Sequence, residues 1–222
     1  NSKLINKTKF NYVFIFLGKN LKNKNKSLSK KINYELPLKF LKKLLKTEKK
    51  FKIIFFGSFS QYDKVYGINK DYIIYKSKLL NEINNIKKKH KNFDYVWIYL
   101  PNIYGLNQNR GFLISDLIFK MKHNNPIKIN NGLKKIYLLN IKDFVRMISH
   151  IKNNWNKYKN NSLFSKYEGP FLLKNISKKI TIQYPKYNGL SIKCNFINEK
   201  KIYPNINFKL KNKFSNFLKN GK

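Results

Sequence analysis

Short apolar runs alternate with stretches of helical periodicity along the first hundred residues. The apolar runs are rich in aromatic and β-branched side chains and cover residues 11–18, 51–56 and 94–100. Between them, leucine and isoleucine recur at helical spacing over residues 37–45 and 72–88, with lysines on the opposite face. A continuous apolar run is typical of a strand buried on both faces of a parallel sheet. The alternation therefore predicts an α/β fold with a doubly wound parallel sheet.

Weaker patterns continue this alternation along the second half of the chain. Apolar positions predict a helix over residues 112–121, short strands near 127–129 and 134–139, and a further helix around Asp143. Because an early helical Asp is stabilised by the positive end of the helix dipole, we expect a structural role for Asp143. Residues 152–168 are polar and predict a connection without regular structure.

The segment before the first predicted helix is polar. Lysine, asparagine and serine fill residues 20–31, and this composition predicts an exposed loop. Pro37 then stands at a position that proline favours at the start of a helix. The helix that follows is amphipathic and basic, so it can lie on a sheet or bind an acidic surface. We favour the sheet, since a strand follows at the distance expected of a βαβ unit.

The length of 222 residues favours one domain, or one large domain with a small appendage. We predict a main domain over residues 1–152 and a smaller C-terminal lobe over 153–222, interleaved with parts of 103–135. Within that lobe, residues 191–192 predict a short strand and residues 208–218 a helix.

The formal net charge of +38 sets this chain apart. A field of that strength attracts RNA, DNA or an anionic membrane surface. Yet Arg occurs only at Arg110 and Arg146, Ala is absent, and Lys, Asn, Ile, Phe and Tyr abound, which are residues of A/T-rich codons. Arginine is also the residue favoured for bidentate recognition of phosphates and bases. We therefore interpret much of the charge as genome composition, and nucleic-acid binding as the less favoured alternative.

Several classes of protein are excluded by composition. With 42% hydrophobic and 16% aromatic residues, the chain is too apolar for intrinsic disorder. Cys194 is the only cysteine, and His90, His123 and His150 lack ligand spacing, so neither an internal disulfide nor a metal site is predicted. No apolar run approaches the roughly 18 residues of a membrane span, and we expect a cytoplasmic protein.

Five segments resemble, in order, the motifs of a known family. Residues 100–109, LPNIYGLNQN, are similar to the R-x-P-N-x-Y-G-P-G-Q segment of the NAD-dependent epimerase/dehydratase family, the extended, nucleotide-sugar type of short-chain dehydrogenase/reductase. Residues 77–82, SKLLNE, resemble its S-K-x-x-x-E helix, and residues 56–62, FGSFSQY, its serine-bearing strand end. Residues 126–132 and 137–145 resemble its P-I-x-I-x-G-x-G and R-D-F-x-x-V-x-D-V-V motifs.

The resemblance implies a Rossmann-like fold with a small substrate-binding lobe. The family begins with a strand, a glycine-rich GxxGxxG turn and a helix N-terminus that receives a pyrophosphate. The sequence contains no such turn, and Asn1 is not preceded by a Met or a signal-peptide pattern. We therefore expect a fragment or processed chain whose Rossmann-like domain starts near the family's fourth strand.

The family chemistry is hydride transfer from a sugar carbon to NAD or NADP, while a tyrosine removes the hydroxyl proton. A lysine four residues later lowers the pKa of that tyrosine and holds the ribose, and a serine positions the substrate. By resemblance, Ser58 is the serine and Lys78 the lysine. A backbone contact within the loop is the alternative role for Ser58, and a solvated helix position the alternative for Lys78.

The position of the catalytic tyrosine departs from the family pattern. Four residues before Lys78 lies Ile74, which cannot carry a proton. Tyr75 is the nearest tyrosine, and we predict it as the catalytic one. Tyr72 with Lys76 restores the spacing of four but abandons the S-K-x-x-x-E register.

The resemblance also implies residues that bind the cofactor and the substrate. Asn102 and Arg110, together with Ser58, are expected to bind a nucleotide-linked sugar, with Arg110 reaching its diphosphate. Tyr99 and Phe16 replace the usual Arg and His of the family. The expected cofactor-binding residues are Leu17, Gly18, Gly57, Lys78, Pro101 and Ile103.

Two functions are compatible with these sequence features. The first is an NAD(P)-dependent epimerase, dehydratase or reductase of a nucleotide-linked sugar. The alternative is a catalytically degenerate protein of the same fold that serves as a basic RNA-binding or assembly subunit. The replacements at Ile74, Tyr99 and Phe16 favour the alternative, while the intact LPNIYGLNQN and SKLLNE segments favour the enzyme. A homodimer paired through the helix near residues 72–90 is possible in either case.

Overall fold

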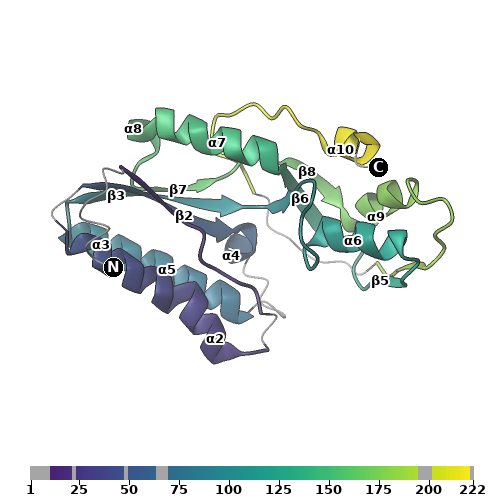
Figure 1. The fold of residues 1–222 in the computed structure, drawn as a ribbon, viewed down its shortest axis with the longest axis horizontal. Helices are drawn as coiled ribbons and strands as arrows, with labels where there is room; N and C mark the ends of the chain where they lie inside the picture. The colour runs from purple at the N-terminus through teal and green to yellow at the C-terminus, as the bar shows by residue number, and fades with distance from the viewer. Residues whose placement is uncertain (1–10, 22–23, 48–49, 64–69, 195–201, 221–222) are drawn as a thin grey trace. The chain divides into compact units, whose positions relative to one another are not determined.

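A computed structural model describes residues 11–21, 24–47, 50–63, 70–194 and 202–220 (Figure 1). The chain forms two compact units. Unit 1 comprises residues 1–100 and 154–164, and unit 2 comprises 101–153 and 165–222. These boundaries differ from the predicted division at residue 152, because residues 154–164 belong with the first hundred residues.

The centre of unit 1 is a parallel sheet with the strand order β1-β2-β3-β7. Its apolar runs form strands as the alternation predicts, which confirms the α/β class with a parallel sheet. β1 spans Tyr12–Ile15, β2 spans Phe51–Ser58, β3 spans Phe93–Leu100 and β7 spans Asn161–Phe164. Ile53 and Ile54 of β2 are both fully buried although they point to opposite faces, as expected of an interior strand.

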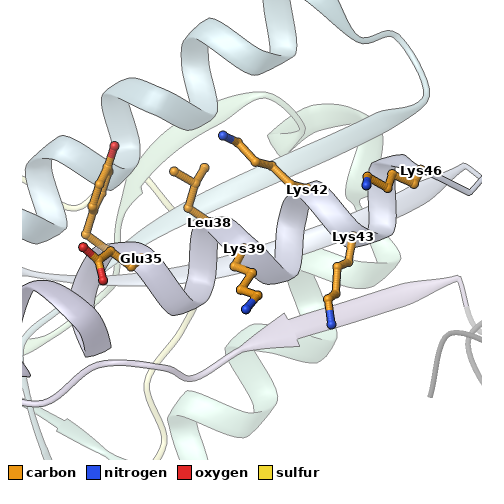
Figure 2. Close-up of a pocket in the computed structure, with 7 residues that line it drawn as sticks. Glu35, Leu38, Lys39, Lys42, Lys43 and Lys46 are labelled. Atoms are coloured by element: carbon orange, nitrogen blue, oxygen red, sulfur yellow. The ribbon is translucent and has the colours of Figure 1, made fainter.

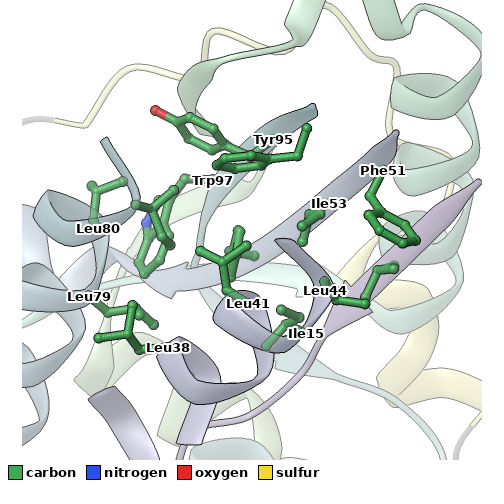
Figure 3. Close-up of a cluster of buried hydrophobic side chains, with 14 residues drawn as sticks. Ile15, Leu38, Leu41, Leu44, Phe51, Ile53, Leu79, Leu80, Tyr95 and Trp97 are labelled. Carbon is green, nitrogen blue, oxygen red and sulfur yellow. The ribbon is translucent and has the colours of Figure 1, made fainter. Parts of the chain in front are cut away.

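Two helices cover one face of this sheet, α3 (Leu36–Leu45) and α5 (Lys70–Lys89). The leucines that set the helical spacing lie buried against alternate residues of the strands, as Figure 3 shows. The opposite face carries α8 (Trp155–Tyr158), where Trp155 meets Tyr12 of β1 edge to face at 5.4 Å. Helices on both faces make unit 1 a doubly wound, Rossmann-like sheet.

The prediction of a loop over residues 20–31 is wrong for its second half. Helix α2 (Lys26–Lys30) begins after Asn25, whose side chain accepts a hydrogen bond from the Leu28 N–H at 2.8 Å. A short π-helix, η1 (Lys31–Glu35), then leads into α3, where Pro37 lies in the first turn as expected. Unit 1 also contains the short helix α4 (Phe59–Asp63) directly after β2.

The polar connection predicted over residues 152–168 is also wrong. This segment contains α8 and β7, and β7 pairs with β3 from Val96↔Asn161 to Tyr99↔Phe164. Its polar composition conceals the structure because β7 is a short edge strand, in which Leu163 is the buried residue. Asn160 reinforces the pairing, since its side chain accepts a hydrogen bond from the Tyr95 N–H and donates one to Asp94.

Unit 2 is built around a sheet of order β4-β6-β8, in which β4 (Asn102–Tyr104) runs parallel to β6 (Lys135–Asn140) and β8 (Glu168–Leu172) runs antiparallel. A second pair joins β5 (Ile127–Ile129) to β9 (Leu190–Ile192). Their apolar residues share a core with α6, α9 and α10. The helices of the unit are α6 (Leu113–Lys122), α7 (Ile141–Asn153), α9 (Leu173–Thr181) and α10 (Phe214–Asn220).

Two carboxylates, the buried Asp143 and the half-buried Glu168, hold the C-terminal segment of unit 2. Asp143, in the first turn of α7, is fully buried and accepts hydrogen bonds from the backbone N–H groups of Lys211 and Asn212. Glu168 of β8 accepts the backbone N–H of Phe214 at 2.9 Å. The predicted helix over 208–218 therefore begins only at Phe214, because the residues before it are held in an irregular course by these side chains. None of the described helices combines the length and apolarity needed to cross a membrane.

Candidate functional site

The carboxyl ends of β1 and β2 lie side by side in unit 1. The strands are parallel and in register, with Ile15 opposite Phe55, so the segments that follow them meet at one edge of the sheet. Ligands of α/β sheets bind at such edges. β1 is followed by Leu17 and Gly18, and β2 ends at Gly57 and Ser58.

Lys76 of α5 is buried at this edge, with 4% of its surface exposed. Its ammonium group donates hydrogen bonds to the backbone oxygen of Leu17 at 2.8 Å and to that of Phe56 at 2.9 Å. It also lies 5.9 Å from the centre of the Trp97 ring. An ammonium group has three N–H donors, and the two bonds within the described part of the chain leave one for a further partner. Lys76 thus links the ends of β1 and β2 to the helix.

Gly18 allows the close approach of Lys76. Its φ of +154° is in a region that side chains rarely adopt, and a Cβ atom there would lie 2.8 Å from both Cε and Nζ of Lys76. Because Cβ contacts of that length do not occur without a shift, any larger residue would displace the ammonium group. The position of the Lys76 ammonium group therefore depends on a glycine at residue 18.

Burial lowers the pKa of Lys76 to about 8, because the charged form loses its hydration. The unfolded chain, whose lysines keep a pKa near 10.5, then binds more protons than the folded chain between pH 8 and 10.5. The buried charge lowers the free energy of unfolding by its full amount below pH 8. This destabilisation decreases as the pH rises from 8 to 10.5. A buried group whose pKa is strongly shifted is a feature of functional sites.

We expect the stability difference between Lys76→Met and the native chain to depend on pH. From pH 7 to pH 10 the native chain should gain roughly 2–3 kcal/mol of unfolding free energy relative to the variant. Urea unfolding at several pH values measures this gain. Lys78→Met, at an exposed position of the same helix, should show no comparable change. A constant difference between Lys76→Met and the native chain across this range would contradict the shifted pKa.

Tyr72 lies one helical turn before Lys76, in the first turn of α5. Its side chain is half-buried and forms a hydrogen bond with the Ser58 hydroxyl. Burial raises the pKa of Tyr72 to about 12, although the hydrogen bond with Ser58 acts in the opposite direction. The Ser58 oxygen accepts the Ser60 N–H at 3.3 Å, which leaves the hydroxyl hydrogen for Tyr72. The structure thus brings Ser58 and Tyr72 together.

The turn that carries Ser58 is fixed by its neighbours. The Gln61 side-chain oxygen accepts the Ser58 N–H at 2.9 Å. At Gly57 a Cβ atom would lie 2.4 Å from Nε1 of Trp97, so only glycine fits between the strand and this fully buried indole. Among the described residues, Nε1 of Trp97 and Nε2 of Gln61 are buried without a hydrogen-bond partner. These two buried N–H donors are therefore available to a ligand or a water molecule.

The residues predicted from the S-K-x-x-x-E register lie elsewhere on α5. Tyr75 is buried, and its neighbour Ile74 is exposed. Lys78 is exposed, and its ammonium group lies 4.9 Å from the centre of the Tyr34 ring. The structure does not bring Lys78 to Ser58; Lys76 occupies the strand ends instead.

One signal in the sequence could have identified Lys76. The buried positions Ile73, Leu80 and Ile83 define the face of α5 that packs on the sheet. Position 76 lies three residues after Ile73 and four before Leu80, so it belongs to the same stripe. A lysine within an apolar stripe, four residues after a tyrosine, indicates the catalytic lysine better than the match of the adjacent residues 77–82 to the S-K-x-x-x-E motif.

The remaining predicted residues belong to unit 2. Asn102 is exposed in β4, and its side chain donates a hydrogen bond to the Tyr137 oxygen at 3.3 Å. Pro101 and Ile103 are half-buried. Arg110 is exposed, and its guanidinium group stacks 3.6 Å from the centre of the Phe119 ring. Over the described parts of the chain, no group of three or more His, Cys, Asp or Glu side chains could hold a metal ion.

Known structures share the arrangement of strands and helices described above. The chain is similar to UDP-glucose 4-epimerase with UDP-glucose from Thermotoga maritima, with a TM-score of 0.78 and 14% identity over 99% of this chain and 78% of that chain. It is similar to UDP-N-acetylglucosamine 4-epimerase from Methanobrevibacter ruminantium in complex with UDP-N-acetylmuramic acid, with a TM-score of 0.71 and 14% identity over 99% and 77% of the two chains. UDP-glucuronic acid 4-epimerase from Bacillus cereus in complex with NAD gives a TM-score of 0.73 and 14% identity over 86% and 64%.

The likeness is one of fold. No protein-family model matches the sequence, and no curated protein matches it. At 14% identity the three structures support the Rossmann-like fold expected from the alternation of strands and helices. They do not by themselves assign an activity to this chain.

Proposed function

We propose that the chain is an NAD(P)-dependent enzyme that acts on a nucleotide-linked sugar by hydride transfer, as an epimerase, dehydratase or reductase. The observation that carries this proposal is the arrangement of Tyr72 and Lys76 on α5. Lys76 lies buried at the ends of β1 and β2, and Tyr72, one turn earlier, bonds to Ser58. We therefore assign the catalytic roles to Ser58, Tyr72 and Lys76, in place of Tyr75 and Lys78.

The residues at the strand ends fit a dinucleotide. The third N–H donor of Lys76, which has no partner among the described residues, suits a ribose hydroxyl, and the Trp97 and Gln61 side chains, each with a buried donor that lacks a partner there, lie beside Gly57. Leu17, Gly18 and Gly57 form the backbone around this lysine. When bound, an oxidised nicotinamide dinucleotide supplies a hydride acceptor and a positive charge.

Each side chain of the site has a distinct task in this proposal. Ser58 orients the sugar hydroxyl through the same oxygen that holds Tyr72. Tyr72 moves the proton at its phenol oxygen, and its place in the first turn of α5 favours the phenolate through the helix dipole. Because its pKa is about 12 in this structure, Tyr72 carries its proton at pH 7. Removal of a substrate proton needs the further positive charge of Lys76 and the oxidised cofactor.

The substrate class rests on the fold neighbours and on unit 2. Two of the similar structures are described with UDP-linked ligands, and one with NAD. For this chain we propose that Asn102 and Arg110 contact the nucleotide-linked sugar, as the resemblance implies.

Cofactor binding by the intact protein tests the proposal. We expect NAD or NADP to bind with a dissociation constant in the micromolar range and to be weakened at least tenfold by Lys76→Met, as measured by calorimetry. Addition of a panel of UDP-, GDP- and dTDP-linked sugars should give turnover with at least one of them. Absence of cofactor binding and of turnover by the folded protein would refute the proposal.

A further inference from the structure

A groove in unit 1 is lined mainly by lysines of a single helix. Its volume is about 400 Å³, and it follows η1 and α3 from Tyr34 to Lys46 (Figure 2). Leu38 contributes apolar surface, and Glu35 is the acidic residue of the lining. The lysines of the groove are Lys39, Lys42, Lys43 and Lys46.

The spacing of these lysines places them on one broad face of the helix, where Lys42 points to one side and Lys39 and Lys43 to the other (Figure 2). They occupy positions i, i+3, i+4 and i+7 of one helix, so they emerge from successive turns. From Lys39 to Lys46 the helix rises by about 10 Å. All four side chains are exposed.

The ion pairs seen among the described residues of unit 1 do not include these four lysines. In the described part of the chain, no carboxylate lies within ion-pair distance of any of the four ammonium groups. Glu35 pairs instead with Lys30 at 2.9 Å. Lys78 adds a fifth positive charge beside the groove, because its ammonium group lies over the Tyr34 ring. A row of unpaired like charges repels itself, and an anionic ligand relieves that repulsion.

We propose that this groove binds the phosphate backbone of single-stranded nucleic acid. A stacked strand carries one phosphate per 3.4 Å, so about three phosphates match the length of the lysine row. Proteins that bind single strands without sequence preference combine a basic groove with an aromatic side chain, here Tyr34. Lysines without arginine suit contact with the backbone rather than with base edges.

An anionic membrane is the competing partner, and α3 does not suit it. A helix that lies in a membrane interface inserts its apolar face. In α3 that face is used in the core, where Leu38, Leu41 and Leu44 pack on the sheet. The exposed surface of the helix carries the four lysines together with Leu36 and Phe40, whose two side chains are too few to form the apolar face that a bilayer needs.

The test compares two variants of equal charge in the intact protein. One carries Lys39→Gln, Lys42→Gln, Lys43→Gln and Lys46→Gln. The control removes four exposed lysines of unit 2, with Lys122→Gln, Lys178→Gln, Lys186→Gln and Lys219→Gln. Fluorescence anisotropy with a labelled 12-nucleotide oligouridine, at several salt concentrations, gives the dissociation constants. Circular dichroism and thermal unfolding establish that each variant is folded.

We expect the groove variant to bind at least tenfold more weakly and the control variant to stay within threefold of the native chain. The slope of log K against log salt should fall by about 2 in the groove variant. Tyr34→Leu should weaken binding about fivefold without changing this slope. If the quadruple groove variant does not fold, the pairs Lys39→Gln/Lys43→Gln and Lys42→Gln/Lys46→Gln replace it.

Three outcomes would overturn the proposal. Equal losses in the groove and control variants would assign the binding to net charge alone. Undiminished binding by the groove variant would exclude the groove. Loss of binding to phosphatidylserine vesicles in the groove variant, with oligouridine binding unchanged, would identify a membrane as the partner.

Discussion

Replacing Tyr72 with phenylalanine should lower the rate of hydride transfer about a thousandfold. The substitution removes the phenol oxygen that bonds to Ser58 and leaves the packing of the ring in place. Proton transfer by a positioned side chain contributes 10² to 10⁴ in rate, and this group carries that step in the proposed reaction. Once a substrate is found, the rate at which the absorbance of the reduced nicotinamide rises in a single turnover measures the effect.

The same helix supplies a matched control. Tyr75→Phe also deletes a phenol oxygen from α5, and Lys78→Met deletes a charge two residues from Lys76. Both should keep at least a third of the native rate, whereas Lys76→Met should fall with Tyr72→Phe. The opposite pattern, with Tyr75→Phe and Lys78→Met inactive, would show that Tyr75 and Lys78 are the catalytic residues, as the SKLLNE segment predicts.

Asp143→Ala should destabilise the protein by about 3–5 kcal/mol. Asp143 is fully buried and accepts hydrogen bonds from Arg146 at 2.7 Å and from two backbone N–H groups of the C-terminal segment. Removing it takes the acceptor from two part-buried backbone donors and from the Arg146 guanidinium and leaves a cavity at a fully buried position, which costs more than the loss of an exposed ion pair. Since small domains have only 5–15 kcal/mol in total, the effect is large. Urea unfolding measures it.

Asp116→Ala provides the control for this prediction. Asp116 pairs with Lys120 at 3.1 Å, but both side chains are more than a third exposed, so the substitution should cost less than about 1 kcal/mol. Hydrogen exchange gives a second readout. In Asp143→Ala the amides of Lys211 and Asn212 should lose protection first. Equal unfolding free energies for the two variants would show that Asp143 is not the anchor described above.

The sequence predicts those elements of the fold that are specified by their own pattern of apolar residues, without contacts to other elements. β2 and β3 are continuous apolar runs, and α3 and α5 have one apolar stripe each, so their own residues specify them. β7 has two apolar residues beside Asn and Ser, and it becomes a strand only because β3 offers it an edge. Helix α2 depends on its Asn25 cap and on continuity with η1, which composition alone does not reveal.

The site was predictable in part. Ser58 follows from the strand end, and both Tyr72 and Lys76 have the correct spacing in sequence. Choosing between Lys76 and Lys78 requires knowing which face of α5 is buried, because adjacent registers of one helix differ by 100° per residue. The motif resemblance pointed to the exposed lysine, whereas the three-dimensional packing places the other one at the strand ends.

Because β7 belongs to the sheet of unit 1, neither unit is a continuous segment of the sequence. The chain passes between the two units at residues 100/101, 153/154 and 164/165. A cut after residue 153 would separate β3 from its neighbour and expose the unpaired backbone of an interior strand, a template for aggregation. Neither unit can therefore be produced, lost or exchanged between genes as one uninterrupted piece of polypeptide.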